Sequence, residues 1–275
     1  MIDINGAELD LKKIASQYAP NAMEVKIAEA MARSAERYRY DTDAELKFEL
    51  QLRRSIVNAA RDLSRSGLQF RVFRKSKSNP DFWTRNADGG FQLAAGVKPS
   101  DAIRDIYDNG RLYGTECATA MVIVYYKALL DVLPEELFNK LFSDITLMNW
   151  QHLDPDLGIV TVDNPPDYLP GDARYVRNPD VDPLTPQWQG ENVFDLGGGQ
   201  YYGHGIGITT MDRIIDALNS ARREGATKSA YLMDMAERPG FKNLYRKLAE
   251  YNARGGAQQA SFTTNFWEAW NRSII

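Results

Sequence analysis

A chain of 275 residues, of which 44% are hydrophobic, is long enough to bury a sizeable core in one large domain or two small ones. Its 33 basic and 37 acidic residues give a net charge of −4 with no long run of one sign, which argues against nucleic acid as a partner. A single cysteine excludes an internal disulfide framework and any multi-cysteine metal site, and with only two histidines we expect no metal.

The N-terminal residues show no sign of a secretion signal or a membrane anchor. MIDINGAELDLKK lacks the basic and then apolar pattern of a secretory signal. The longest apolar stretch, Ala118 to Tyr126, falls far short of the ~20 residues that span a bilayer. We therefore expect a soluble protein that is made in the cytosol and has no membrane partner.

The first third of the chain is predicted to be mainly helical. Apolar residues recur near helical spacing in three stretches, at 9–18, 23–38 and 43–65, and Gly67 follows the third. From residue 69 the pattern changes to alternation, around Phe70 and again at 82–84 and 91–93, with turn residues at 86–90. We expect three helices and then a short antiparallel hairpin or meander.

Three more helices are predicted before strands return. They cover residues 99–107, about 116–132, and a short stretch that begins at Pro134. Residues 145–150 have the pattern of a strand. Prolines and aspartates are frequent between residues 154 and 186, which predicts exposed turns rather than a regular element.

Three consecutive glycines, at 197–199, give the clearest hairpin signal in the sequence. They separate two apolar-rich runs, Glu191–Leu196 and Tyr201–Ile208. Helices at 211–223 and 241–251 follow, and no clear domain boundary precedes Ala253. The simplest fold class is α+β, a single domain in which a cysteine-bearing helix packs on an antiparallel sheet, with extra helices at the N-terminus.

The chain's one cysteine, Cys117, stands where a polar segment meets a long apolar helix. If Thr115 is the N-cap, Cys117 is the second helical residue, and the partial positive charge of the helix N-terminus favours its thiolate. Such a position can lower a cysteine pKa from about 8.5 to about 3.5–7.5. The alternative is inert packing, since free cysteines are among the most buried residues. The spacing alone leaves both interpretations open.

The glycine hairpin supplies two candidate proton carriers for a cysteine nucleophile, Glu191 in WQGENV and His204 in YYGHGIGI. With an even loop centred between Gly197 and Gly198, these two residues face one another across the ladder; an odd loop turns them to opposite faces. The alternative is a solvated glutamate and a half-buried histidine without a catalytic role. Glu116 is either a second carboxylate near the sulfur or an ordinary acidic residue of a first helical turn.

Several longer stretches resemble the bacterial spore-coat transglutaminases, which are protein-glutamine gamma-glutamyltransferases of Bacillus-type organisms. The stretches lie between about Ala44 and Leu232, in the same order as in that family, and cover most of the chain. They read AELKFEL, SGLQF, PSDAIRDI, ECATAMVIVYY, NPDVDP, QWQGENV, HGIGI, IIDALNS and SAYL.

The resemblance implies a compact, calcium-independent enzyme without a cofactor, with a papain-like core of the NlpC/P60 type. It implies that Cys117 is the nucleophile, that Glu191 is the catalytic carboxylate and that Glu116 is able to share this role. His204 matches the position of the papain-like base.

The resemblance also places three aromatic residues, Phe70, Trp150 and Trp188, at the walls of a substrate passage. For these residues plain core packing is the alternative interpretation.

The implied reaction joins a glutamine side chain to a lysine side chain through a thioester on the cysteine. The implied partners are spore coat proteins. The resemblance further implies an enzyme that acts as a monomer. It implies that the enzyme is made in the mother-cell cytoplasm and is deposited at the spore coat. Two other functions stay open: a cysteine amidase or peptidase of the NlpC/P60 type, and a non-catalytic coat component.

The C-terminal end differs in composition from the rest of the chain. We expect residues 1–253 to form the transglutaminase domain and residues 254–275 to form an aromatic-rich C-terminal extension. Its Phe262, Phe266, Trp267 and Trp270 have spacings that suit an amphipathic helix. Such a helix has three possible roles: docking on the domain, binding coat partners or covering the active site.

Overall fold

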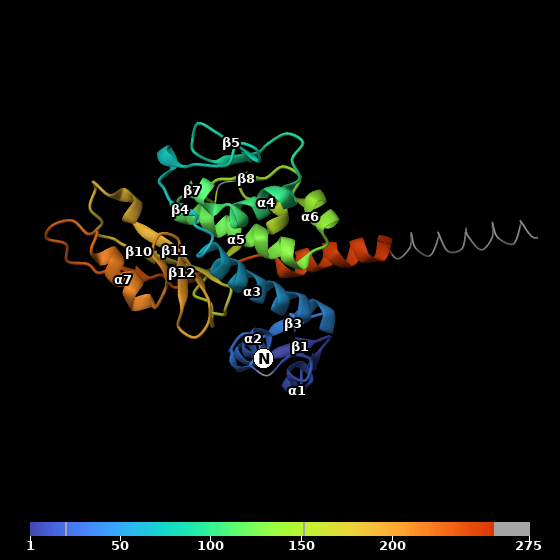
Figure 1. Cartoon of the computed structure of the whole chain (residues 1–275). Helices are drawn as coiled ribbons and strands as arrows, with labels where there is room; N and C mark the ends of the chain where they lie inside the picture. The colour runs from blue at the N-terminus through green and yellow to red at the C-terminus, as the bar shows by residue number, and fades with distance from the viewer. Residues whose placement is uncertain (20, 151, 256–275) are drawn as a thin grey trace, which may run out of the picture.

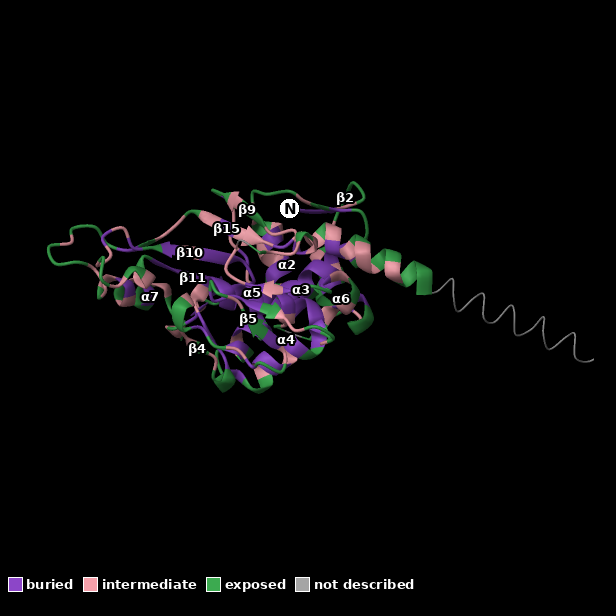
Figure 2. Cartoon of the chain, turned by 90° about the horizontal axis from the view of Figure 1, so that it is seen from above, coloured by how far each residue is buried: buried purple, intermediate pink, exposed green. Residues whose placement is uncertain are grey.

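The helix that begins at Cys117 lies at the centre of the protein in a computed structural model that describes residues 1–19, 21–150 and 152–255 (Figure 1). This helix, α5 (Cys117–Val132), packs along α3 (Asp43–Leu63), and both helices are largely buried (Figure 2). The predicted helix at 43–65 is therefore confirmed, with Thr42 as its N-cap. Because α5 is apolar on nearly all sides, it has to be surrounded by other elements.

One large antiparallel sheet covers one side of α5. Its strand order is β13-β12-β11-β10-β15-β9, and β14 pairs with β10. The Tyr125 ring of α5 packs edge-on against Phe194 of β11, with 5.1 Å between the ring centroids. The predicted arrangement of a cysteine helix on an antiparallel sheet is confirmed. The strands are β9 (Val160–Asp163), β10 (Ala173–Arg177), β11 (Gly190–Asp195), β12 (Tyr201–Gly203), β13 (Gly207–Thr209), β14 (Tyr231–Leu232) and β15 (Met235–Arg238).

The proline-rich region holds two of these strands, so the prediction of turns alone was wrong there. Strand β10 lies in the middle of the sheet, with Ala173 and Val176 fully buried. Pro170 and Pro179 flank the strand and do not interrupt it. The strand lacks proline because each of its residues has to pair with a neighbouring strand.

The N-terminal part mixes helices with a small sheet, where only helices were predicted. Strands β1 (Ile2–Ile4), β2 (Ala7–Glu8) and β3 (Tyr38–Tyr40) form this sheet, and α1 (Leu11–Ala15) and α2 (Met23–Arg33) pack beside it (Figure 1). The predicted helix at 23–38 is too long. The backbone becomes extended at Ser34, where α2 ends, and β3 then pairs in parallel with β1.

A second small sheet confirms the hairpin predicted at 82–93. It contains β5 (Trp83–Arg85), β6 (Phe91–Leu93) and β8 (Thr146–Leu147), all antiparallel. The strand around Phe70 does not join it. Instead β4 (Gln69–Phe70) pairs in parallel with β7 (Gly114–Thr115), which leads directly into α5.

The remaining predicted helices are present with slightly different ends. They are α4 (Pro99–Asp108), α6 (Glu135–Leu141), α7 (Met211–Asn219) and a helix at 241–255 whose Leu244 is buried in the main core. Short 3₁₀ turns are η1 (Phe73–Lys75), η2 (Gly110–Leu112), η3 (Pro155–Leu157) and η4 (Pro186–Trp188). The predicted extension at 254–275 lies outside the described residues from 256 onward. None of the helices in the described ranges is both long and apolar enough to cross a membrane.

Candidate active site

The sulfur of Cys117 is positioned by the passage from β7 into α5. Glu116, rather than Thr115, is the N-cap of α5, so Cys117 is the first helical residue and not the second. The Glu116 carboxylate accepts hydrogen bonds from the backbone N–H groups of Ala118, at 2.6 Å, and of Thr119, at 2.7 Å. A carboxylate therefore occupies the positive end of the helix that was expected to stabilise the thiolate.

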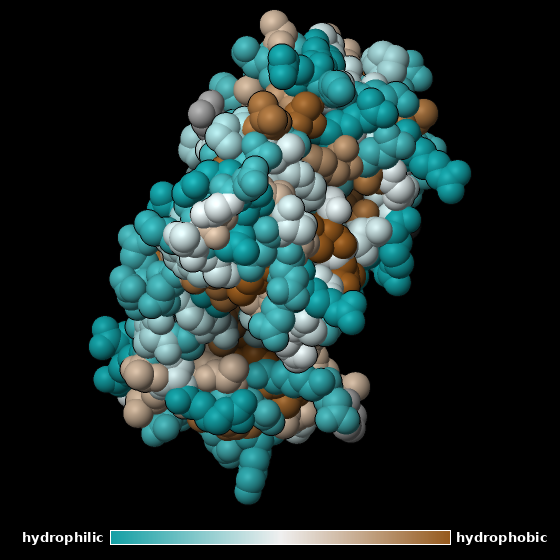
Figure 3. Space-filling view, turned by 90° about the vertical axis from the view of Figure 1, so that its left-hand side faces the viewer, coloured by the Kyte–Doolittle hydropathy of each residue, from teal (hydrophilic) through white to brown (hydrophobic). Residues whose placement is uncertain are grey.

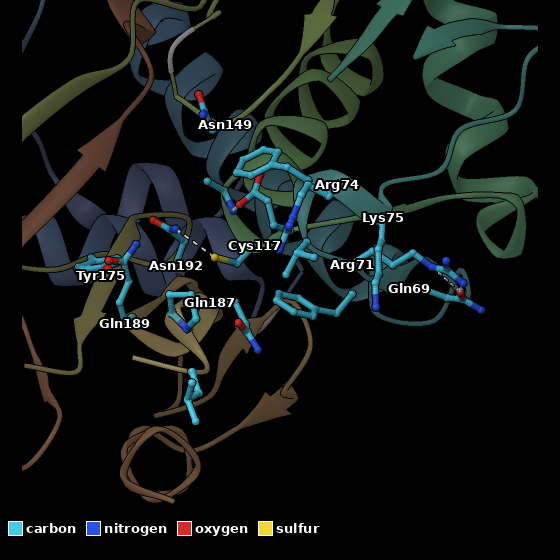
Figure 4. A pocket seen from close by; sticks show the side chains of 18 residues that line it. Gln69, Arg71, Arg74, Lys75, Cys117, Asn149, Tyr175, Gln187, Gln189 and Asn192 are labelled. Carbon is cyan, nitrogen blue, oxygen red and sulfur yellow. Dashed lines mark hydrogen bonds between the residues drawn. The ribbon is translucent and has the colours of Figure 1, made fainter. Parts of the chain in front are cut away.

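Cys117 is half-buried at a pocket of about 1110 Å³. One wall is residues 69–75, and the opposite wall includes Tyr175, Gln187, Gln189 and Asn192 (Figure 4). The face of the molecule that carries α7 is mostly hydrophilic, with separate apolar patches among the hydrophilic residues (Figure 3). The sulfur is thus accessible to a side chain that enters the pocket.

Asn192 contacts the sulfur directly, and sequence reasoning missed it. Its Nδ2 donates to Cys117 Sγ at 3.4 Å (Figure 4). Its Oδ1 accepts from Trp150 Nε1 at 3.4 Å. Because the indole N–H is only a donor, this second bond turns the amide so that its NH₂ group faces the sulfur. Its position beside Glu191 in GENV, inside a predicted buried strand, was the available signal.

Glu191 is a buried carboxyl group, with 1% of its surface exposed. Within residues 1–19, 21–150 and 152–255, neither of its carboxyl oxygens has a hydrogen-bond partner. Burial and the nearby Glu116 raise the pKa of Glu191 well above the ordinary value. The Cys117 thiol and the backbone N–H of His204 oppose this rise in pKa without reaching full hydrogen-bonding geometry.

The Cys117 pKa moves in the direction opposite to that expected from a helix N-terminus. Burial, followed by the charges of Glu191 and Glu116, raises it to about 12, while the donors of Asn192 act to lower it. The negative charge of Glu191 disfavours ionisation of the thiol, so the ionisation of the two groups is coupled. A thiolate forms here when the glutamate takes up the proton of the thiol.

The His204 ring contacts groups other than the sulfur of Cys117. Three residues connect β11 to β12 between Leu196 and Gln200, and Val193 pairs with Gly203, so the hairpin is the odd case. The His204 ring lies at 3.2 Å from the Tyr202 hydroxyl and at 3.3 Å from the Gln69 carbonyl oxygen. Burial lowers its pKa to about 4, and it does not line the pocket. The histidine links the β12–β13 turn to β4.

Gly203, on the strand opposite, leaves room for the Glu191 side chain. A Cβ atom at this position would lie 3.0 Å from Glu191 Oε1 and 3.1 Å from Cγ. These distances are shorter than ordinary van der Waals contact, so the absence of a side chain at residue 203 lets the carboxyl group fold over β12.

Comparison with known proteins identifies the family. Residues 1–249 match the family model for protein-glutamine gamma-glutamyltransferase. The protein-glutamine gamma-glutamyltransferase of Bacillus cereus is 45% identical over 249 residues, which cover 90% of this chain and 88% of the relative. That of Bacillus mycoides is 47% identical over 226 residues, covering 82% and 81%. The chain belongs to this transglutaminase family. A solved transglutaminase from Geobacillus stearothermophilus, without its C-terminal extension, matches with a TM-score of 0.72 and 52% identity over 75% of this chain and 98% of that one.

The family assignment confirms the predicted activity, a protein-glutamine gamma-glutamyltransferase that is an acyltransferase. It also confirms the mixed α and β class of the fold, with which the NlpC/P60 type of core is consistent. The assignment to individual residues of the roles in catalysis stays a prediction.

The three aromatic residues predicted to form substrate walls take different places in this transglutaminase. Phe70 lines the pocket and stacks on Trp188, with 5.7 Å between ring centroids and 17° between ring planes. Trp150 lies against Tyr125 and donates to Asn192. Neither tryptophan is among the residues that line the pocket, but each contacts a residue that does, Trp188 contacting Phe70 and Trp150 contacting Asn192.

Among the described residues, no group of three or more His, Cys, Asp or Glu side chains is placed to hold a metal ion.

Proposed function

We propose that Cys117 forms a thioester with a glutamine side chain and that Glu191 carries the protons of both half-reactions. The observation that supports this most directly is the placement of an accessible sulfur beside a buried carboxyl group that lacks a full hydrogen bond. Such a carboxyl group is free to exchange a proton with the thiol and with a substrate.

In the first half-reaction the proton of the Cys117 thiol moves to the Glu191 carboxylate. The thiolate attacks the carboxamide carbon, the C–N bond breaks, and the Glu191 proton leaves with the amide nitrogen as ammonia. Asn192, whose NH₂ group faces the sulfur, stabilises the negative charge on sulfur and then the charge on the carboxamide oxygen.

In the second half-reaction a lysine amine attacks the thioester. Glu191, now a carboxylate, accepts a proton from the amine, the C–S bond breaks, and the thiol is restored. The net change converts a glutamine and a lysine into an isopeptide bond and ammonia. Phe70 and the Trp188 ring stacked on it restrict water near the thioester and so favour the amine over hydrolysis.

A paired measurement of ammonia and isopeptide tests this function. With a glutamine donor and an amine acceptor, we expect equal amounts of ammonia and isopeptide from the wild-type protein and neither product from Cys117→Ala. Ammonia without isopeptide would instead indicate an amidase. Undiminished crosslinking by Cys117→Ala would overturn the assignment of the nucleophile.

We further propose that the natural substrates are glutamine- and lysine-donating spore coat proteins, that the enzyme acts as a monomer without calcium or a cofactor, and that it is deposited at the spore coat from the mother cell. The support is the sequence resemblance and the Bacillus origin of the relatives. Deleting the gene should increase the coat protein extracted from spores, and activity should persist in a calcium chelator. Unchanged coat extraction would contradict the proposed substrates.

A further inference from the structure

The wall of the pocket next to Phe70 is strongly basic. The sequence has no acidic residue between Asp62 and Asp81, and the stretch RVFRKSK begins at Arg71. Arg71, Arg74 and Lys75 line the pocket, and we call these three residues the basic ridge. The ridge is therefore a local excess of positive charge in a chain whose net charge is −4.

No residue of the basic ridge forms an ion pair within the described part of the chain. Arg71 donates to the neutral Gln69 Oε1 at 3.1 and 2.8 Å, and Arg74 and Lys75 are exposed. Cations elsewhere do pair; Arg104, for example, contacts Glu135 at 2.6 Å. The charge of the ridge is thus available to a partner.

The backbone of the basic ridge is held firmly. The N–H of Arg71 donates to Thr115 O at 2.7 Å, which ties the start of the ridge to β7 just before the catalytic helix. The Ser76 hydroxyl donates to Gly89 O at 2.7 Å, and Arg85 donates to Phe73 O at 2.9 Å. The backbone that carries the three cations is therefore fixed relative to Cys117.

Among the residues that the structure describes, the opposite wall of the pocket carries no charged side chain. It includes Tyr175, Leu184, Gln187 and Gln189, and Figure 4 shows the labelled members of the two walls on opposite sides of Cys117. A lysine ammonium is repelled by the ridge and approaches more easily along this neutral wall. An acidic segment is attracted to the ridge for the same reason.

We propose that the basic ridge binds acidic side chains that flank the reactive glutamine of the acyl-donor protein. The proposal rests on the proposed function, because it assigns the donor to one wall of that pocket and leaves the neutral wall to the lysine. The enzyme then prefers glutamines in acidic surroundings, and the preference is electrostatic.

The test uses glutamine peptides that differ only in their flanking residues, which are acidic, neutral or basic, with one small amine as the acceptor. We expect kcat/KM for the acidic peptide to exceed that for the basic peptide by about tenfold at low salt, as a few exposed charge pairs give. The difference should shrink in high salt, where the Debye length falls to about 3 Å.

Two charge-reversal variants locate the effect. Arg74→Glu with Lys75→Glu should invert the preference, so that the basic peptide becomes the better donor. Lys12→Glu with Lys26→Glu is the matched control, because it changes the net charge equally at two exposed cations of the N-terminal part. The control should keep the preference of the wild-type protein.

The outcomes separate this proposal from the function on which it rests. Equal use of all three peptides by the wild-type protein would overturn the ridge proposal and leave the transglutaminase function intact. The same conclusion follows if the control variant loses the preference too, or if acidic residues help only when they flank the lysine of an acceptor peptide. Failure of the wild-type protein to modify even the neutral peptide would overturn both.

Discussion

Two buried carboxyl groups, one just before β10 and one in the neighbouring strand β11, differ in their hydrogen-bond partners. Asp172, just before β10, is fully buried and accepts from Arg53 at 2.8 Å and from Arg238 at 2.8 and 2.9 Å. Glu191 in β11 is as deeply buried but has no full hydrogen bond among the described residues. Burial alone would raise the pKa of Asp172, but the two arginines outweigh it and the pKa is lowered.

We interpret this difference as one between a structural carboxylate, Asp172, and the carboxyl group that we propose to be reactive, Glu191. A buried charge that is paired and hydrogen-bonded holds elements together, here α3, β15 and the start of β10. Removing one partner would leave the charge of the other buried and unpaired, which is costly. A buried acid that lacks such partners has a raised pKa and is available to accept and donate a proton. We therefore predict that changing Asp172 affects stability and that changing Glu191 affects activity.

The largest effect is expected for Glu191→Gln. The amide keeps the shape of the side chain but carries no proton between thiol and substrate, so kcat should fall by about 10²- to 10⁴-fold. Isopeptide formation measured beside thermal unfolding checks this. His152→Ala is the control, because His152 is exposed and should tolerate the change. Activity of Glu191→Gln within a few-fold of wild type would remove Glu191 from the mechanism.

Asp172→Asn should act mainly on stability. It leaves two arginines near an uncharged group, and breaking a buried pair in this way costs about 3–5 kcal/mol of unfolding free energy. Urea denaturation measures the loss, and the folded fraction should retain its specific activity. A variant as stable as the wild-type protein would show that the network of Arg53, Arg238 and Asp172 does not hold the core.

A smaller effect is expected from the two residues behind the sulfur. Asn192→Ala removes the donor to Sγ. Because a hydrogen bond to the developing charge is lost, kcat should fall by about 10- to 100-fold. Trp150→Phe keeps a ring but loses the N–H that orients the amide, and should lower kcat only a few-fold. Steady-state kinetics should show both changes in kcat more than in KM; a change confined to KM would contradict the positioning role.

The sequence was sufficient for some parts of the site and not for others. The long apolar run after Cys117 predicts a buried helix, and the glycines at 197–199 predict the β11–β12 hairpin, because both are local patterns. The parity of the hairpin loop decides whether Glu191 and His204 share a face of the ladder, and sequence alone did not settle it. The choice of Glu116 over Thr115 as the cap likewise depends on geometry, since both residue types accept hydrogen bonds.

Long-range pairings were the least predictable. β10 lies among prolines, and its place in the sheet depends on partners such as β11 and β15 that are distant in sequence. Asn192 was overlooked because an asparagine in a strand has no distinctive pattern until the sulfur beside it is known. The unpaired state of Glu191 is equally a property of the folded surroundings.

The smallest and most discriminating effect is on the pH dependence of stability. Because the pKa of Glu191 is raised in the folded state, its contribution to stability is complete below the ordinary value of 4.5 and is lost as the pH rises through the folded value. Asp172 behaves oppositely: its contribution is present above the ordinary 3.8 and is lost as the pH falls through its lowered value.

Unfolding free energies measured across pH should therefore diverge in opposite directions. Each unit of pKa shift corresponds to about 1.4 kcal/mol. Relative to wild type, Glu191→Gln should become more stable as the pH rises from 4.5, and the deficit of Asp172→Asn should shrink as the pH falls below 3.8. Parallel curves for the wild-type protein and Glu191→Gln would contradict a raised pKa at Glu191.

The most direct test of the account is the mass of the protein after incubation with a glutamine peptide and no amine. We expect an adduct equal to the peptide less one ammonia, located on Cys117, formed quickly by the wild-type protein and much more slowly by Glu191→Gln. An adduct on another residue, or equal rates in the two proteins, would contradict the claim that Cys117 and Glu191 act together.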